Sequence, residues 1–247
     1  MRILTVNGIT KTGKTTTVEA IIKELKKRRY SVGSVKDIHY EAFTMDREGT
    51  NTHRHHQAGA DMVVAKGVHE TDVLMYKAVN IERIFNFFNH DWCVCEGVDG
   101  ANIPKIVCGK DESDIQLKLD DITIAISGVF ANANDKYEHW DVYHYEKDIE
   151  KLVDYLEKVV PHRLPNVDDA CCKACGMTCH DMLKHVLKYP QDNQCVLNQQ
   201  QVTVSINNQE LTMVPFVQTL VRNAVLSIVT ELDGYQENAT IKVEFKQ

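Results

Sequence analysis

A glycine-rich run near the N-terminus has the residue types and spacing needed to hold phosphate. Residues 8–15 read Gly-Ile-Thr-Lys-Thr-Gly-Lys-Thr and fit the pattern G-x-x-x-x-G-K-[S/T]. Glycines let successive backbone N–H groups curl around an anion, and the helix that follows directs its positive end toward it. We expect Lys14 to reach the β- and γ-phosphates and the Thr15 hydroxyl to bind Mg²⁺. The residues expected to contact a nucleoside triphosphate are Gly8, Thr10, Lys11, Thr12, Gly13, Lys14, Thr15 and Thr16.

A second group of reactive side chains is a run of cysteines in the C-terminal third of the chain. Five of the eight cysteines lie between residues 171 and 195, which in a reducing compartment indicates metal binding rather than disulfides. Cys172, Cys175, Cys179 and Cys195 follow the pattern C-x₂-C-x₃-C-x₁₅-C, and Cys171 could replace Cys172. Such thiolates can surround one [4Fe–4S] cluster or one zinc ion, and the spacing alone leaves both open beside a set of plain thiols.

Strands and helices alternate along the first 160 residues, which places the phosphate motif between a buried strand and a helix. Short apolar runs predict strands over Met1–Val6, Ser31–Asp37, Asp61–Ala65, Val73–Tyr76, Asp91–Glu96, Ile122–Ser127 and Trp140–Tyr143. Helices are predicted over Lys14–Arg29, Thr52–Ala58, Ile81–Asn89 and Lys147–Val160. This alternation is typical of an α/β fold, a P-loop NTPase with a mostly parallel sheet and flanking helices.

Two prolines, Pro161 and Pro165, interrupt the chain after the last of these helices. We place a domain boundary there, between a nucleotide-binding domain of residues 1–161 and a smaller α+β cysteine-cluster domain of residues 162–247. The elements expected in the second domain are a β-hairpin of Gln201–Ile206 and Glu210–Val214, a helix over Phe216–Leu232 and a strand over Thr240–Phe245.

Composition excludes several classes of partner. The formal net charge is -7, so the chain has no excess of basic residues with which to bind nucleic acid. No stretch approaches the roughly 20 apolar residues that span a bilayer, and we expect no membrane association. The N-terminal residues form no apolar signal core, from which we expect a cytoplasmic protein.

Further segments follow the phosphate loop in a characteristic order. They are Val35–His39, Asp46–Thr52, Arg54–Ala60, Asp91–Gly97 and Ile103–Ile106. Over residues 1–160 this order resembles the molybdopterin-guanine dinucleotide biosynthesis protein B family. The resemblance implies a homodimeric, GTP-binding accessory protein with low GTPase activity, which assists the enzyme that attaches GMP to molybdopterin.

The resemblance also suggests which acidic residues act. Asp46 falls in the family's aspartate–x–x–glycine segment, and Glu96 stands at the end of its glutamate–glycine strand. Either acid could hold Mg²⁺ or orient water, because a carboxylate at the C-terminal edge of a parallel strand faces the γ-phosphate. Lys14, Asp46 and Glu96 are therefore the expected catalytic residues.

The chain departs from the family pattern in places. Asp37-Ile38-His39-Tyr40 stands where the family has a histidine-rich turn, Asn51-Thr52 replaces an aspartate–serine pair, and His56 occupies an arginine position. No N-K-x-D guanine motif is present, so GTP is implied by the family and ATP stays open.

The cysteine segment resembles the four-cysteine iron–sulfur domain of corrinoid iron–sulfur proteins and of some membrane electron-transport subunits. Those proteins have one residue more in each of the last two gaps. The resemblance favours a [4Fe–4S] cluster over zinc at Cys172, Cys175, Cys179 and Cys195.

Together these observations predict an accessory GTP-binding protein of molybdenum or tungsten cofactor biosynthesis, acting with a partner transferase. One alternative is an ATP-dependent assembly or activation protein for a metalloenzyme client, in which the nucleotide gates electron transfer from the cluster. The other is a non-catalytic docking module that nucleotide stabilises.

Overall fold

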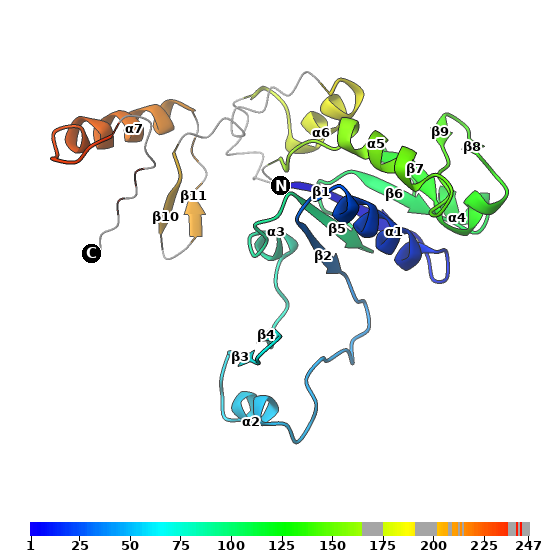
Figure 1. Ribbon diagram of the computed structural model, residues 1–247, viewed down its shortest axis with the longest axis horizontal. Coiled ribbons are helices and arrows are strands. Elements are labelled where there is room, and N and C mark those ends of the chain that lie inside the picture. Colours follow the sequence, from blue (N-terminus) through cyan, green and yellow to red (C-terminus); the bar gives the residue numbers. More distant parts are fainter. Residues whose placement is uncertain are drawn as a thin grey trace.

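The computed structural model describes residues 1–164, 175–190, 202–206, 209–211, 213, 215–236, 241 and 243. A five-stranded sheet in the order β2-β5-β1-β6-β7 organises the first part of the chain, and every pair in it is parallel (Figure 1). Its strands are β1 (Arg2–Asn7), β2 (Val32–Lys36), β5 (Trp92–Glu96), β6 (Lys105–Cys108) and β7 (Thr123–Ser127). The loop that follows β1 therefore lies at the same edge as the carboxyl ends of β2 and β5.

The central strands are apolar because both of their faces are covered. β5 and β6 are buried at every residue, as expected for the inner strands of a parallel sheet. On one face, α1 (Lys14–Lys27) and α5 (Ile149–Val159) contribute Ile21, Leu25 and Leu152 to a core with Leu4 and Val6. On the other, α3 (Ile81–Phe85) and the loop 97–104 add to a core with Ile3, Phe85, Cys93, Cys95, Val98 and Ile103.

Short elements complete the region around β7. They are α4 (Glu112–Gln116), the 3₁₀ helix η1 (Gly128–Asn132), β8 (Lys136–Tyr137) and β9 (Trp140–Asp141). β8 and β9 pair with each other, and Val142 then forms a single parallel bridge with Ile126 of β7. The chain after Val142 thus returns to the edge where β7 ends.

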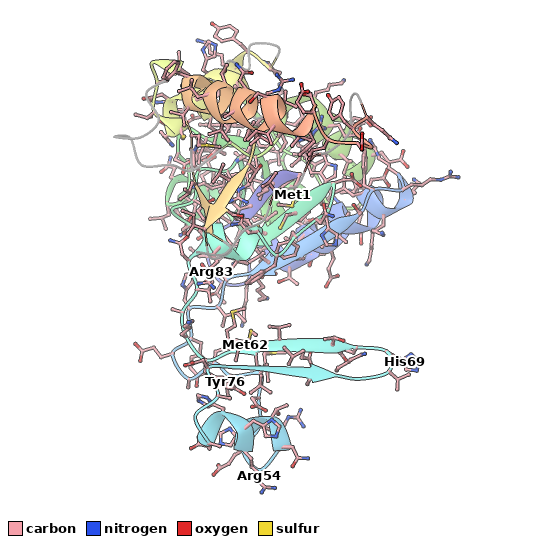
Figure 2. The ribbon with its side chains drawn as sticks, turned by 90° about the vertical axis from the view of Figure 1, so that its left-hand side faces the viewer. Met1, Arg54, Met62, His69, Tyr76 and Arg83 are labelled. Carbon is pink, nitrogen blue, oxygen red and sulfur yellow. The ribbon has the colours of Figure 1, made fainter. Side chains whose placement is uncertain are left out.

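Residues 37–80, which we call the lobe, hang from the sheet between β2 and α3 (Figure 1). The lobe holds α2 (Asn51–Gln57) and an antiparallel pair, β3 (Met62–Lys66) and β4 (Thr71–Met75). Figure 2 shows α2 beneath this hairpin, with Arg54 on the helix and His69 at the turn. The lobe makes no strand pair with the main sheet.

Beyond residue 164 the described elements are α6 (Cys179–Lys188), β10 (Val204–Ile206), β11 (Gln209–Leu211) and α7 (Pro215–Val229). α6 packs on the first part of the chain, because Met182, Leu183 and Val186 form one cluster with Ile122 and Leu164. The boundary expected at residue 161 stays a prediction, but this cluster crosses it. No helix within the described residues has the length and apolar character needed to span a bilayer.

The expected parallel sheet is confirmed, with corrections to its members. The strands expected over Asp61–Ala65 and Val73–Tyr76 form, but they pair only with each other, in the lobe. The strand expected over Trp140–Tyr143 is reduced to β9. β6, which follows Pro104 and has only four residues, was not expected. The hairpin β10–β11 is confirmed in shorter form, and the strand expected over Thr240–Phe245 lies mostly outside the described residues.

Candidate nucleotide-binding site

The phosphate motif folds as the tight loop that its glycines predict. Gly13 caps α1 with a left-handed φ of 92°, and Lys11 also has a positive φ of 63°. The Thr12 side chain turns inward and donates to the Ile9 carbonyl at 2.9 Å, while Thr10, Lys11, Thr15 and Thr16 are exposed. Lys14 Nζ lies over the loop and donates to the same Ile9 carbonyl at 2.5 Å. The Lys14 ammonium therefore lies beside the loop that is predicted to hold the phosphates.

Gly128, which follows the edge strand β7, packs against the backbone of the phosphate loop. Gly128 follows β7 with a φ of 83°, and a Cβ at this position would stand 2.2 Å from the Thr12 carbonyl oxygen. That carbonyl accepts a hydrogen bond from the Val129 N–H at 3.0 Å. Sequence reasoning missed Gly128, although a glycine directly after the strand expected over Ile122–Ser127 was a usable signal.

Glu96 brings a carboxylate to the loop. It ends β5, in register with Val6 of β1 and Lys36 of β2. Thr15 Oγ1 donates to Glu96 Oε1 at 2.8 Å, and Lys36 Nζ contacts the same oxygen at 3.0 Å. Within residues 1–164, all of which are described, no donor reaches Glu96 Oε2. A hydroxyl and a carboxylate side by side are oxygen donors of the kind that Mg²⁺ takes, so these residues fit the expected ion.

Asp46, the other expected acid, lies in the lobe. Its carboxylate accepts hydrogen bonds from the hydroxyls of Thr50, Thr52 and Tyr76 and from the Arg47 N–H. The Tyr76 hydrogen bond, at 2.7 Å, is the main cause that lowers the pKa of Asp46 to about 2. Burial, with this hydrogen bond, raises the pKa of Tyr76 to about 12. Among the described residues, nothing from the phosphate loop contacts Asp46, so the structure brings only Glu96 to the site.

The cysteine segment is described in part. Cys175 and Cys179 are half-buried beside the start of α6, whereas Cys171, Cys172 and Cys195 lie outside the described residues. Among the residues that are described, no three His, Cys, Asp or Glu side chains are grouped to hold a metal ion. Cys175 and Cys179 therefore show where two of the expected ligands stand, and the four-cysteine set stays a prediction.

α6 meets the nucleotide-binding part at the loop that follows Glu96. Asn102 Nδ2 donates to the Cys179 carbonyl at 2.7 Å, and His180 contacts Asp121 at 3.0 Å. Between this loop and α6 lies a cavity of about 390 Å³, lined in part by Asn7, Asp99 and Lys105. Its lining includes Asn7, directly before the phosphate loop, but no residue of 8–15.

Comparison with known proteins supports one family. A model described as molybdopterin guanine dinucleotide synthesis protein B matches residues 3–128. A putative molybdopterin-guanine dinucleotide biosynthesis adapter protein of Methanocaldococcus jannaschii is 31% identical over 253 residues, covering 99% of this chain and 97% of the relative. The corresponding adapter protein of Haemophilus influenzae is 27% identical over 131 residues, covering 51% of this chain and 73% of the relative. The archaeal match thus includes the cysteine-bearing segment.

The fold also resembles that of solved structures of this family. The crystal structure of Bacillus subtilis MobB superimposes with a TM-score of 0.54 at 20% identity, covering 66% of this chain and all of that chain (100%). At this identity the likeness concerns the fold alone, an α/β domain with a mostly parallel sheet.

Proposed function

The chain belongs to the molybdopterin guanine dinucleotide synthesis protein B family, and on that premise we propose that it is an adapter of molybdopterin guanine dinucleotide biosynthesis that binds GTP with Mg²⁺. The observation that carries the nucleotide part is the contact of Thr15 with Glu96 at 2.8 Å, beside Lys14 and a loop of backbone N–H groups. Few other ligands than a nucleotide triphosphate with its cation use this combination.

The residues divide the work as follows. The loop N–H groups and the N-terminus of α1 hold the phosphates, and Lys14 neutralises charge on the β- and γ-phosphates. Thr15 and Glu96 would hold Mg²⁺, which supplies further neutralisation of the phosphate oxygens. Low GTPase activity and an adapter role toward a partner transferase complete this proposal.

Nucleotide binding is tested by thermal unfolding and calorimetry with GTP, GDP and ATP, each with Mg²⁺ or with EDTA. We expect GTP at one hundred times its Kd to stabilise the chain by about 2.7 kcal/mol. Lys14→Ala should abolish this shift. Lys151→Met, which removes an exposed lysine of α5 that pairs with Asp148, serves as the matched control. Retained GTP binding in Lys14→Ala would show that the loop is not the site.

The contact between α6 and the loop after Glu96 favours a second candidate, an ATP-dependent activation protein whose nucleotide state acts on the cysteine segment. The path runs from Glu96 through the loop 97–104 to Asn102 and the Cys179 carbonyl. The same calorimetry decides, because this candidate requires ATP to bind more tightly than GTP. A docking module without catalysis would bind nucleotide tightly and show no phosphate release.

We further propose a [4Fe–4S] cluster at Cys172, Cys175, Cys179 and Cys195, with zinc as the alternative. It is supported by the partial exposure of Cys175 and Cys179, which leaves both thiols available to a ligand. Anaerobic purification with iron, sulfide and zinc analysis tests it. Equal amounts of iron and sulfide that are lost in Cys175→Ser would support the cluster, and zinc would support the alternative. A protein that contains neither iron nor zinc would reject both.

A homodimer is proposed through the lobe. Met62, Val64 and Val73 are each about half exposed on one face of the hairpin β3–β4, with Val64 directly opposite Val73. A lone two-stranded hairpin is marginally stable, and its open edges favour pairing with another strand. A second copy would cover this face and extend the sheet. Val64→Asp should then convert a dimer to a monomer in sedimentation analysis, and an unchanged mass would reject this interface.

A further inference from the structure

Lys36 is a further charged group at the phosphate-loop edge, beside Lys11, Lys14 and Glu96. It is the last residue of β2, and the parallel pairing of β2 with β5 sets it directly beside Glu96. Its Nζ contacts Glu96 Oε1 at 3.0 Å, the oxygen that also accepts the Thr15 hydroxyl. Two strands separated by 60 residues in sequence therefore deliver one ion pair to the site.

The two partners of this ion pair differ in exposure. The Glu96 side chain is 11% exposed, whereas that of Lys36 is 55% exposed. Glu96 is thus fixed among the strand ends, and Lys36 covers it from the solvent side with a flexible stem. Because Lys36 is the exposed partner, its ammonium can leave the pair toward solvent, and Glu96 then keeps the Thr15 hydroxyl and the cation proposed beside it.

The charges at this edge also favour an anion. The phosphate loop carries Lys11 and Lys14, and the last residues of β2 and β5 are Lys36 and Glu96, which makes three positive charges and one negative charge. In the order β2-β5-β1, Lys36 stands one strand beyond Glu96 from the loop that follows β1. Lys14 serves the β- and γ-phosphates from the loop side. Lys36 lies on the other side of the Thr15–Glu96 pair. We therefore expect it to reach only the terminal phosphate of a bound triphosphate.

We propose that Lys36 binds the γ-phosphate, exchanging its contact with Glu96 for one with a phosphate oxygen, and so sets the preference for triphosphate over diphosphate. The inference rests on the proposed nucleotide binding. It differs from a role in which Lys36 only positions Glu96, because that role acts through the metal ion and affects diphosphate and triphosphate alike.

The test compares Lys36→Met, Lys36→Arg and Lys151→Met by calorimetric titration with GTP and GDP, each with Mg²⁺ and with EDTA. If the wild type prefers adenine, ATP and ADP replace them. We expect Lys36→Met to weaken GTP binding on the order of 10- to 100-fold, the value of a charge-assisted hydrogen bond, with GDP affinity unchanged. The loss should persist in EDTA, Lys36→Arg should restore most of it, and Lys151→Met should behave as the wild type.

The outcomes separate the two proposals. Equal losses for GTP and GDP that vanish in EDTA would overturn the γ-phosphate contact and leave a positioning role. Unchanged affinities in Lys36→Met would overturn it as well. In both cases the wild type still binds nucleotide, and the proposed function stands. A wild-type chain that binds no nucleotide overturns both.

Discussion

The carboxyl edge of the main sheet and the lobe each hold an acidic side chain that accepts hydrogen bonds, yet the two acids differ in where their partners come from. Glu96 meets Thr15 and Lys36, which are 81 and 60 residues away in sequence. Asp46 meets Thr50 and Thr52 nearby, and Tyr76 30 residues away. The first site depends on the parallel register of three strands, and the second on a local turn closed by the end of a hairpin.

The difference shows which acid is available to a ligand. Asp46 accepts four donors from its own lobe, so its lone pairs are largely used in holding α2 to the hairpin. Both donors to Glu96 end on one oxygen, and the other oxygen is left for an incoming cation. We infer that Asp46 stabilises the lobe and that Glu96 serves the phosphates.

The largest expected difference between the two regions is in the loss of stability when one glycine in each is replaced by alanine. Gly128→Ala adds a Cβ that would stand 2.2 Å from the Thr12 carbonyl oxygen, at a φ of 83°. We expect it to lower the free energy of unfolding by about 3 kcal/mol, from the left-handed backbone and the clash together. Gly59→Ala in the lobe has a φ of 104° but meets nothing within 4 Å. It should cost about 1 kcal/mol, from the backbone alone.

Urea unfolding of both variants measures these costs, and nucleotide titration shows where they act. Gly128→Ala should also weaken nucleotide binding, because Gly128 supports the loop at Thr12. Gly59→Ala should leave it unchanged. Equal losses of stability in the two variants would mean that the sheet edge is no more tightly packed than the lobe.

The next largest effect separates the two acids directly. Glu96→Gln should weaken GTP binding in Mg²⁺ by about tenfold or more, since it removes a charge that the ion requires, and should have little effect in EDTA. Asp46→Asn should change the affinity by less than about twofold, the range of an uninvolved surface substitution. Fluorescent-nucleotide titrations with and without Mg²⁺ check this. A comparable loss in Asp46→Asn would place the lobe at the phosphates.

The sequence predicted the phosphate loop because its geometry is encoded by neighbouring residues. Gly13, Lys14 and Thr15 need only a strand before them and a helix after them. Predicting the contact of Glu96 with Thr15 would have required the order of the strands in the sheet, which no local sequence pattern specifies. Asp46 and Glu96 looked equivalent from their motifs, and only the register of β5 with β1 distinguishes them.

The lobe was harder to predict for a related reason. Apolar runs such as Asp61–Ala65 have the composition of sheet strands, and nothing local indicates that they pair away from the main sheet. β6 was not predicted because its four residues, directly after a proline, are too few to show a strand pattern. Gly128 was identifiable only as a glycine at a strand end. Its importance comes from contact with Thr12, which is distant in sequence.

The smallest expected effect is on the pH dependence of the stability that Asp46 gives to the lobe. The pKa of Asp46 is lowered from 3.8 to about 2, mainly by the Tyr76 hydroxyl. A lowered carboxyl pKa means that the contribution of Asp46 to stability is present above pH 3.8 and is lost as the pH falls toward about 2. Tyr76→Phe keeps the ring that stacks on His56 at 3.5 Å and removes only the hydroxyl. The pKa of Asp46 should therefore rise toward 3.8, so that the loss of stability still begins near pH 3.8 but is smaller and is complete at a higher pH than in the wild type.

Carboxyl-carbon NMR titration of the wild type and of Tyr76→Phe measures this shift. Asp91 provides the internal control, because its pKa is lowered by Ser31 at the base of the main sheet and should not respond to Tyr76. An Asp46 pKa that stays near 2 without the hydroxyl would show that Thr50 and Thr52 hold the carboxylate by themselves. The lobe would then be closed by its local turn and by the stacking of the residue 76 ring on His56, without help from the hydroxyl.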